Sequence, residues 1–246
     1  MKGLRDKSVL VTGGGGAIGA AICRRFAEEG ARVLVADRNE QGANAVAAEV
    51  GGTALVFDIS DYAAARNAVL SAGQIDVLVN NAGWDRFQNF LDSDPAEWEE
   101  LIAINLRGPL NMHHLVLPQM AARGTGRVVN ISSDAARVGS SGESVYSACK
   151  GGILSLTKTL ARELARKGVT VNAVCPGPTD TPILRGFLGE GEAGKKVYDA
   201  LVRAIPLKRV GKPDDVPGIV AFLASDEAAY LTGQVISVSG GLTMAG

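Results

Sequence analysis

The chain has 246 residues, of which 46% are hydrophobic and 5% aromatic, and its 25 Lys and Arg nearly balance its 26 Asp and Glu. A chain of this length can bury a sizeable core, and α/β folds of this size commonly stay undivided, so we expect one domain over residues 1–246. The net charge of −1, without any basic cluster interleaved with aromatics, argues against a nucleic-acid partner.

Cysteine usage bears on metal binding and on the cellular compartment. Cys23, Cys149 and Cys175 are odd in number and widely spaced, with only His113 and His114 as possible co-ligands. This pattern predicts neither a disulfide framework nor a metal site, and it favours a cytoplasmic protein. No apolar run in the chain predicts a signal peptide or a membrane span.

Short β-branched runs alternate along the chain with longer segments of helical periodicity. The predicted strands span residues 8–12, 32–37, 54–58, 75–80, 126–132, 169–175 and 235–238. The predicted helices span residues 18–29, 40–50, 62–72, 95–123 with a break at Gly108-Pro109, 144–167 and 212–224. Runs such as Val9-Leu10-Val11 are apolar on both faces, as expected of parallel strands covered on two sides. The alternation predicts an α/β, doubly wound, Rossmann-like parallel sheet of about seven strands with helices on both faces.

Residues 181–212 break this rhythm. The segment carries several glycines and mixed charges, and it is too long for an ordinary connection between two elements. We interpret it as a substrate lid that contains a short helix near residues 195–204.

A glycine-rich turn follows the first predicted strand and opens the first predicted helix. It consists of Gly13 to Gly16 and Gly19, and no Gly-Lys-Ser/Thr of a P-loop follows it. Glycines let the backbone approach a pyrophosphate, whose charge is stabilised by the unpaired N–H groups at a helix N-terminus. Because the acid Asp37 ends the next strand at the usual spacing, the pattern predicts a dinucleotide-binding site.

Asp37 favours NAD over NADP as the cofactor. Its carboxylate can accept hydrogen bonds from the adenosine ribose, whereas a 2′-phosphate at about 4 Å would be repelled by roughly 4 kcal/mol per charge pair at an effective dielectric near 20. Arg38 either meets such a phosphate or is simply solvated. Asp58, which ends the third strand, either binds the adenine edge or caps a turn.

Tyr146 and Lys150 are four residues apart at the start of a predicted helix, so they share one helix face. A nearby cation favours phenolate over phenol and lowers the pKa of a tyrosine, which suits a general acid or base. Ser132 and Ser133 end the fifth strand, at the carboxyl edge where Rossmann-like sheets bind ligands.

Six features agree in order and spacing over essentially the whole chain with one family. They are Thr12-Gly to Gly19, Asn80-Asn-Ala-Gly83, Asn105, Ser133, Tyr146-x-x-x-Lys150 and Pro176-Gly-x-x-x-Thr181. Together they resemble the short-chain dehydrogenase/reductase family. Ala17 departs from the pattern, since the family usually has its middle glycine there, and its methyl group is expected to weaken cofactor binding modestly.

The resemblance implies specific roles. Tyr146 would exchange the proton of the substrate oxygen, and Ser133, rather than its neighbour Ser132, would hydrogen-bond that oxygen. Lys150 would lower the tyrosine pKa and hold the nicotinamide ribose, and Asn105 would anchor a water of the proton relay. The implied cofactor-binding residues are Gly13, Gly16, Ala17, Ile18, Gly19, Asp37, Arg38, Asp58, Ile59, Asn81, Ala82, Gly83, Tyr146, Lys150, Pro176, Gly177, Thr179 and Thr181.

A finer resemblance concerns the substrate. It is carried by the segments Asn80 to Asp85, Asn111 to His114, Ser133 to Glu143, Cys175 to Thr181 and Val238 to Gly246. These segments are similar to the 2-hydroxycyclohexanecarbonyl-CoA dehydrogenases, which implies NAD-dependent oxidation of a cyclic or short β-hydroxyacyl-CoA. A 3-oxoacyl thioester reductase, on ACP or CoA, is the alternative. A non-catalytic nucleotide-binding sensor and a methyltransferase are alternatives of other classes, but both leave the tyrosine–lysine pair without a purpose.

Several residues have two interpretations each. Trp84 and Asp85 either face the substrate, or the tryptophan packs under the lid. Asp134 either binds a substrate hydroxyl or caps a loop. The basic residues of the lid either meet the phosphates of coenzyme A or are only solvated; these are Arg185, Lys195, Lys196, Lys208 and Arg209.

The resemblance also implies a homotetramer. The uncharged segment 228–246 is compatible with one, since we expect it to be buried within the fold or against another subunit.

Overall fold

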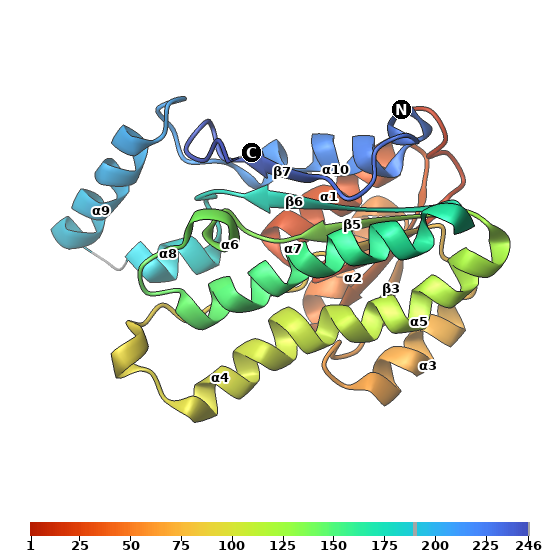
Figure 1. Ribbon diagram of the computed structural model, residues 1–246, viewed down its shortest axis with the longest axis horizontal. Coiled ribbons are helices and arrows are strands. Elements are labelled where there is room, and N and C mark those ends of the chain that lie inside the picture. The colour runs from red at the N-terminus through yellow and green to blue at the C-terminus, as the bar shows by residue number, and fades with distance from the viewer. Residues whose placement is uncertain (189–190, 246) are drawn as a thin grey trace.

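The computed structural model describes residues 1–188 and 191–245. In this part of the chain, seven parallel strands form one sheet in the order β3-β2-β1-β4-β5-β6-β7 (Figure 1). The strands are β1 Ser8–Thr12, β2 Arg32–Asp37, β3 Thr53–Val56, β4 Val77–Asn80, β5 Gly126–Ile131, β6 Val169–Pro176 and β7 Val235–Val238. The predicted doubly wound α/β architecture is confirmed.

Helices cover both faces of the sheet. One face carries α1 Ala17–Glu28, α2 Glu40–Val50 and α10 Pro217–Ala224; the other carries α3 Tyr62–Ala72, α5 Gly108–Arg123 and α7 Ser144–Leu164, with α4 Pro95–Ile102 against α7. The shorter elements are η1 Phe90–Asp92, α6 Ala135–Val138, η3 Ala165–Lys167, η4 Pro213–Asp215 and η5 Asp226–Ala228. Helices α8 Pro182–Leu188 and α9 Gly191–Ala204 lie beyond the carboxyl ends of the strands, with α9 standing apart at the left of Figure 1.

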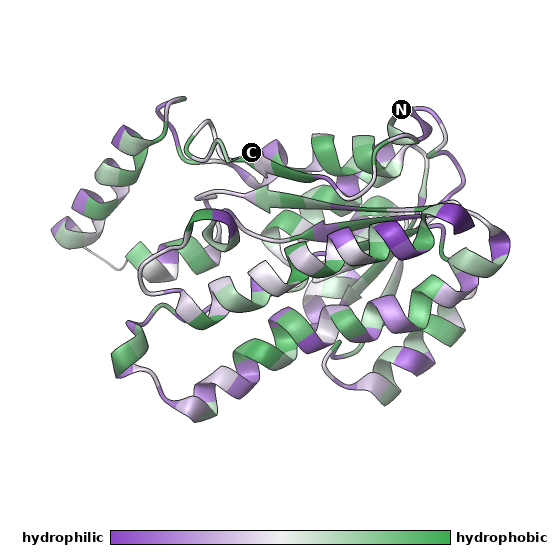
Figure 2. Ribbon diagram, in the orientation of Figure 1, coloured by the Kyte–Doolittle hydropathy of each residue, from purple (hydrophilic) through white to green (hydrophobic). Residues whose placement is uncertain are grey.

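The central strands are apolar on both faces because helices cover both. In β1, Val9 and Val11 belong to the core that contains Phe26 of α1, whereas Leu10 belongs to the core that contains Met112 of α5. All five side chains have no exposed surface. Full burial of such a side chain contributes about 1.5–3 kcal/mol, so these two cores hold the helices against the sheet (Figure 2).

A row of buried polar side chains fixes α7 relative to the sheet. Asn80 Nδ2 on β4 donates to Asn130 Oδ1 on β5 at 2.9 Å, and Asn130 Nδ2 donates to Thr157 Oγ1 on α7 at 2.9 Å. All three residues are buried. Because buried polar groups are costly when unpaired, this row sets the position of the helix that carries Tyr146 and Lys150.

The helix predicted over 95–123 does not break at Gly108-Pro109. The chain stays helical from α4 to α5 through η2, a π-helical turn at Ala103–Arg107. Pro109 lies in the first turn of α5, where a missing N–H is tolerated. The predicted break is therefore wrong, and the irregularity falls instead on the turn that contains Asn105.

Two further expectations need correction. Residues 182–188 form α8, which hydropathy did not reveal, and the helix predicted at 195–204 begins earlier, at Gly191. The segment 228–245 is buried only in part within this chain, since Ala228 and Thr243 are buried whereas Tyr230 and Met244 are highly exposed. Within the described residues, none of the helices combines the length and apolarity needed to cross a membrane.

Candidate active site

The glycine turn is packed tightly between α1 and the end of β4. Gly13 has a φ of 64°, and a Cβ there would lie 2.7 Å from Ala82 Cα; a Cβ at Gly19 would overlap the Gly13 carbonyl oxygen. Asn81 Nδ2 donates to the carbonyl oxygens of Thr12 and Gly13 at 3.0 and 3.1 Å. Only glycine meets these demands, since other residues rarely adopt such a φ and no side chain fits.

The tip of the turn is open by comparison. A Cβ at Gly16 would meet only the Gly13 carbonyl oxygen, at 3.4 Å. Ala17 and Ile18 begin α1 directly after it, and α1 has no side-chain cap at its N-terminus. The first N–H groups of α1 are thus available to an anion, as the dinucleotide interpretation requires.

Asp37 lies against this turn. Its Oδ2 accepts from the Gly15 N–H at 3.0 Å and its Oδ1 from the Asn39 N–H at 2.9 Å. The carboxylate therefore stands where a ribose attached to the pyrophosphate would come, and a 2′-phosphate in that place would meet like charge.

The residues after β2 and β3 serve mainly local structure. Arg38 pairs with Asp58 at 3.9 Å, and Asp58 Oδ1 accepts from the N–H and hydroxyl of Ser60 at 2.8 and 2.7 Å. This is the turn-capping interpretation of Asp58. Ile59 is buried, and a Cβ at Gly108 would collide with its side chain.

Asn105 is buried in the π-helical turn, and its side chain hydrogen-bonds the loop after β4. Its Oδ1 accepts from the Trp84 N–H at 3.2 Å, and its Nδ2 donates to the carbonyl oxygens of Trp84 and Leu101 at 2.7 and 3.0 Å. The amide therefore holds residues 83–85 next to the start of α7. The water proposed for Asn105 stays a prediction.

The structure brings Ser133, Tyr146 and Lys150 together at the carboxyl edge of the sheet. Lys150 is buried; its Nζ lies 5.6 Å from the centre of the Tyr146 ring and donates to the Ile131 carbonyl at 3.1 Å. The Ser133 side chain hydrogen-bonds Tyr146, whereas the Ser132 hydroxyl donates to the Lys150 carbonyl at 2.9 Å. Of the two serines, only Ser133 is turned toward the phenol.

The pKa of Tyr146 is not lowered as expected from its lysine neighbour. Burial raises it most, the charges of Asp85 and Glu143 raise it further, and the hydrogen bond from Ser133 lowers it. Burial also lowers the pKa of Lys150 to about 8. Burial and the two carboxylates therefore outweigh any lowering of the Tyr146 pKa by the charge of Lys150.

Asp85 was considered as facing the substrate, but Glu143 was not among the residues assigned to the site. Burial and a hydrogen bond with Glu143 raise the pKa of Asp85 to about 7. A signal for Glu143 was available, since it precedes Tyr146 by three residues at the start of a helix and so shares its face. Nothing in the sequence placed Asp85 beside it, because the two are brought together only by the fold.

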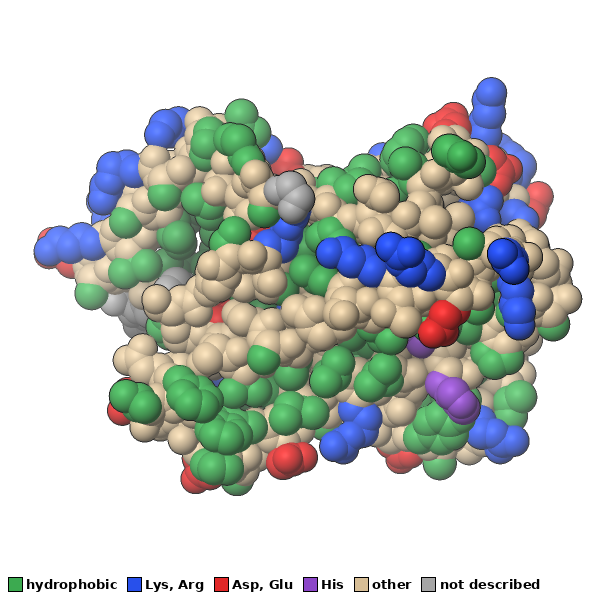
Figure 3. Space-filling model, viewed as in Figure 1, with side chains coloured by type: hydrophobic (Ala, Val, Ile, Leu, Met, Phe, Trp, Pro, Cys, Tyr) green, Lys and Arg blue, Asp and Glu red, His purple; other side chains and the backbone are tan. Residues whose placement is uncertain are grey.

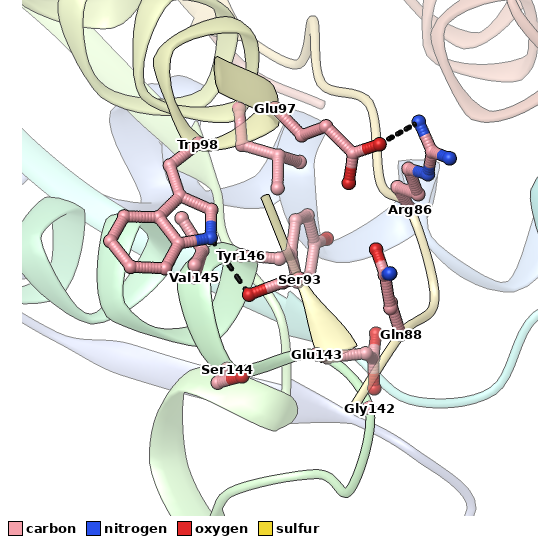
Figure 4. A pocket seen from close by; sticks show the side chains of 11 residues that line it. Arg86, Gln88, Ser93, Glu97, Trp98, Gly142, Glu143, Ser144, Val145 and Tyr146 are labelled. Carbon is pink, nitrogen blue, oxygen red and sulfur yellow. Dashed lines mark hydrogen bonds and ion pairs between the residues drawn. The ribbon is translucent and has the colours of Figure 1, made fainter. Parts of the chain in front are cut away.

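A small pocket that is open to solvent lies beside Tyr146 (Figure 4). Its lining includes Gln88, Glu143 and Tyr146, together with an Arg86–Glu97 ion pair at 2.6 Å. The Gln88 Oε1 atom is buried and has no hydrogen-bond partner. The wall of this pocket is therefore polar on the side next to the phenol.

The segment after β6 leads from the carboxyl edge of the sheet into the lid. Thr179 Oγ1 donates to the Gly177 carbonyl at 2.9 Å, and Thr181 Oγ1 accepts from the Leu184 N–H at 3.3 Å at the start of α8. Pro176 ends β6 itself. These residues adjoin the lid, and their contacts with a cofactor stay a prediction.

Asp134 is buried and bonded within the protein. Its Oδ1 accepts from the Ser237 hydroxyl, and its N–H donates to the Pro176 carbonyl at 3.0 Å. These bonds match the loop-capping interpretation. In the described ranges 1–188 and 191–245, no group of three potential metal ligands occurs.

Comparison with known proteins assigns the family. The family model described as enoyl-(acyl carrier protein) reductase matches residues 15–243. The chain belongs to this family, a branch of the short-chain dehydrogenase/reductase oxidoreductases.

Individual relatives are similar over nearly their whole length. The chain is 41% identical over 241 residues to the acetoacetyl-CoA reductase of Rhizobium meliloti (strain 1021), covering 96% of this chain and 98% of that protein. It is similar to the crystal structure of levodione reductase, with a TM-score of 0.91, 32% identity, and 96% and 97% of the two chains covered. It is also similar to a 3-oxoacyl-[acyl-carrier protein] reductase with bound NAD from Brucella melitensis, with a TM-score of 0.90, 32% identity, and coverage of 98% and 92%.

Proposed function

We propose that the protein is an NAD-dependent oxidoreductase that interconverts a β-hydroxyacyl thioester and the corresponding 3-oxoacyl thioester. The observation that carries this proposal is the convergence of Ser133, Tyr146 and Lys150 at the carboxyl edge of the sheet, beside the glycine turn. The relatives named for acetoacetyl-CoA and 3-oxoacyl-[acyl-carrier protein] support the thioester class.

NAD fits the residues of the first half of the chain. The pyrophosphate would lie at the uncapped N-terminus of α1, over Gly16 and Ala17, and the adenosine ribose would meet Asp37. The loop Asn81 to Gly83, tied to the glycine turn, would line the adenosine side. The relative crystallised with NAD supports this choice. When bound, NAD supplies the hydride acceptor or donor.

The chain's own residues handle the proton. Tyr146 would take the hydroxyl proton of the substrate in oxidation and return it in reduction. Ser133 would hydrogen-bond the same oxygen and hold it against the phenol. Lys150, with its Nζ directed to the Ile131 carbonyl, would hold the nicotinamide ribose, and Asn105 would keep the loop at residues 83–85 in place.

A cyclic acyl group is the second candidate. The similarity of the segments around Trp84, Asp134 and Thr181 to the 2-hydroxycyclohexanecarbonyl-CoA dehydrogenases favours it. The exposed Lys195 and Lys196 on α9 are available for coenzyme A phosphates, and Figure 3 shows Lys and Arg side chains along this lobe. Arg185 and Arg209, by contrast, are already paired with acids, at 2.8 and 2.6 Å.

The test is to follow nicotinamide absorbance with purified protein and two thioesters. Acetoacetyl-CoA is given with NADH, and 2-hydroxycyclohexanecarbonyl-CoA with NAD. Turnover of the first alone supports the short acyl chain, and turnover of the second supports the cyclic substrate. Tyr146→Phe should abolish either activity, while Tyr230→Phe, at a fully exposed position, should not. Cofactor binding without any Tyr146-dependent turnover would instead support a nucleotide sensor.

We also propose that the protein is a cytoplasmic homotetramer. The support is that β7 is an edge strand, since an unpaired edge is usually covered. Apolar side chains at Tyr230, Leu242 and Met244 in the terminal segment are exposed in the single chain, as expected if another subunit covers them. Light scattering at micromolar concentration tests this, and a monomeric mass would contradict it.

A further inference from the structure

Two carboxyl groups stand beside the phenol of Tyr146, and the proposed reaction gives neither of them a role. Glu143 is the N-cap residue of α7, three residues before Tyr146, and it lines the same pocket. Asp85 comes from the loop after β4 and hydrogen-bonds Glu143. The pair thus joins two segments that are far apart in the sequence.

The loop that carries Asp85 is held in place on both sides. At its start, a Cβ at Gly83 would lie 3.0 Å from Lys150 Nζ and 3.1 Å from Asn105 Oδ1. At its end, the Gln88 N–H donates to the Gly142 carbonyl at 2.8 Å, next to Glu143. Asp85 therefore lies between two anchored positions, one next to Lys150 and the other next to Glu143.

Two cations lie nearby. The charge of Lys150 lowers the pKa of Asp85, but burial and Glu143 raise it more. Arg86 pairs with Glu97 at 2.6 Å. In the part of the chain that the structure describes, no ion pair of 4.0 Å or less involves Asp85 or Glu143. The Asp85 Oδ1 atom is buried without a hydrogen-bond partner.

The thiol of Cys175 adds no charge to this region. Burial raises its pKa to about 11, so it is neutral at working pH. The field next to Tyr146 is therefore negative on the side of Asp85 and Glu143.

We propose that Asp85 and Glu143 select substrates by charge, admitting an uncharged thioester or ester next to the reacting carbonyl and rejecting the free carboxylate. This inference rests on the proposed function, since it names the form of the acyl group. In a β-oxo acid the carboxyl carbon is separated from the reacting carbonyl by a single carbon. When Tyr146 and Ser133 hold the carbonyl oxygen, a free carboxylate must lie within reach of the two acids, where like charges repel.

The test compares acetoacetate with methyl acetoacetate, its uncharged ester, in NADH-dependent reduction. We expect kcat/KM of the wild-type protein for the ester to exceed that for the acid by at least tenfold at pH 8. Asp85→Asn and Glu143→Gln should each raise the acid-to-ester ratio of kcat/KM about tenfold. Glu100→Gln, the same change of charge at an exposed position of α4 outside the pocket, should leave the ratio unchanged.

A pH series separates charge selection from a structural role. Because the pKa of Asp85 is about 7, discrimination against the acid should increase from pH 6 to pH 8 in the wild type and flatten in Asp85→Asn. Equal kcat/KM for acid and ester in the wild type, or variants that leave the ratio unchanged, would overturn the proposal. Where turnover is too slow to measure, the dissociation constants of the acid and the ester are compared instead. Both are titrated into the NADH-loaded protein, and NADH fluorescence reports their binding.

The same assays distinguish a failure of the proposed function from a failure of charge selection. Reduction of methyl acetoacetate without reduction of acetoacetyl-CoA would remove the thioester assignment while leaving charge selection intact. Reduction of acetoacetyl-CoA with no preference for the ester over the acid would remove charge selection alone.

Discussion

The Nζ atom of Lys150 lies 5.6 Å from the centre of the Tyr146 ring, one helical turn away on α7. The same atom donates to the Ile131 carbonyl at the end of β5, so the lysine links the helix to the sheet at the site itself. Burial lowers the pKa of Lys150 to about 8. Its charge is therefore sensitive to small changes around it, as in sites that tune proton transfer.

Replacing Lys150 should impair turnover. We expect Lys150→Met to lower kcat by at least about 100-fold, because the residue would no longer hold the nicotinamide ribose or supply a positive charge beside the phenol. Lys158→Met, at an exposed position on the same helix, is the matched control and should stay within about twofold of the wild type. Steady-state rates with a thioester substrate measure both. A Lys150→Met protein with near-normal kcat would exclude this role.

Asp37 should decide the choice of cofactor. Asp37→Asn removes the negative charge that would repel a 2′-phosphate, while it keeps an oxygen that can accept the Gly15 N–H. We expect NADH to bind about tenfold more weakly, since hydrogen bonds to a charged group are worth about 1.5–3 kcal/mol, and NADPH to bind more tightly. Fluorescence titration with both nucleotides measures the change. An unaltered preference for NADH would contradict the assignment.

The glycine turn offers a matched pair of substitutions. A Cβ at Gly19 would overlap the Gly13 carbonyl oxygen, a backbone atom that cannot move aside, whereas a Cβ at Gly16 has space. We expect Gly19→Ala to destabilise the protein by about 2 kcal/mol or more and Gly16→Ala by less than about 1 kcal/mol. Thermal unfolding without added nucleotide compares them. Equal loss of Tm in the two variants would show that the tight packing of Gly19 does not matter for stability.

Asp85 should make stability depend on pH. Its pKa is raised in the folded protein to about 7, so its contribution is fully present below its unfolded pKa and is lost as the pH rises through 7. Asp85→Asn should therefore become more stable relative to the wild type between pH 5 and pH 8. The gain should be roughly 1–2 kcal/mol after allowance for partial exposure, which corresponds to a few degrees in Tm.

The control for this pH effect is Glu100→Gln, which removes an exposed carboxylate from α4. Its Tm difference from the wild type should be the same at pH 5 and pH 8. If the Asp85→Asn difference were equally flat, the raised pKa of Asp85 would not hold in solution.

Local patterns in the sequence predicted most of the architecture. Apolar runs such as Val9 to Val11, followed by a helical period, indicate a buried parallel strand whatever the rest of the chain does. The helices predicted at 40–50 and 62–72 have the same bounds in the structure, where the side chains of Asn39 and Asp61 cap their N-termini. The π-helical turn was not predicted, since a proline at the first turn of a helix and a proline that breaks one look alike in the sequence.

Some features of the candidate site were likewise predictable from the sequence, and others were not. Tyr146, Lys150 and Glu143 share a helix face, and the glycine turn with Asp37 follows a known spacing, so the sequence alone brings each of these groups together. The approach of Asp85 to Glu143 and the raised pKa of Tyr146 depend on burial and on segments far apart in the chain. Only the tertiary structure decides them, because desolvation and charge interactions act through space and not along the sequence.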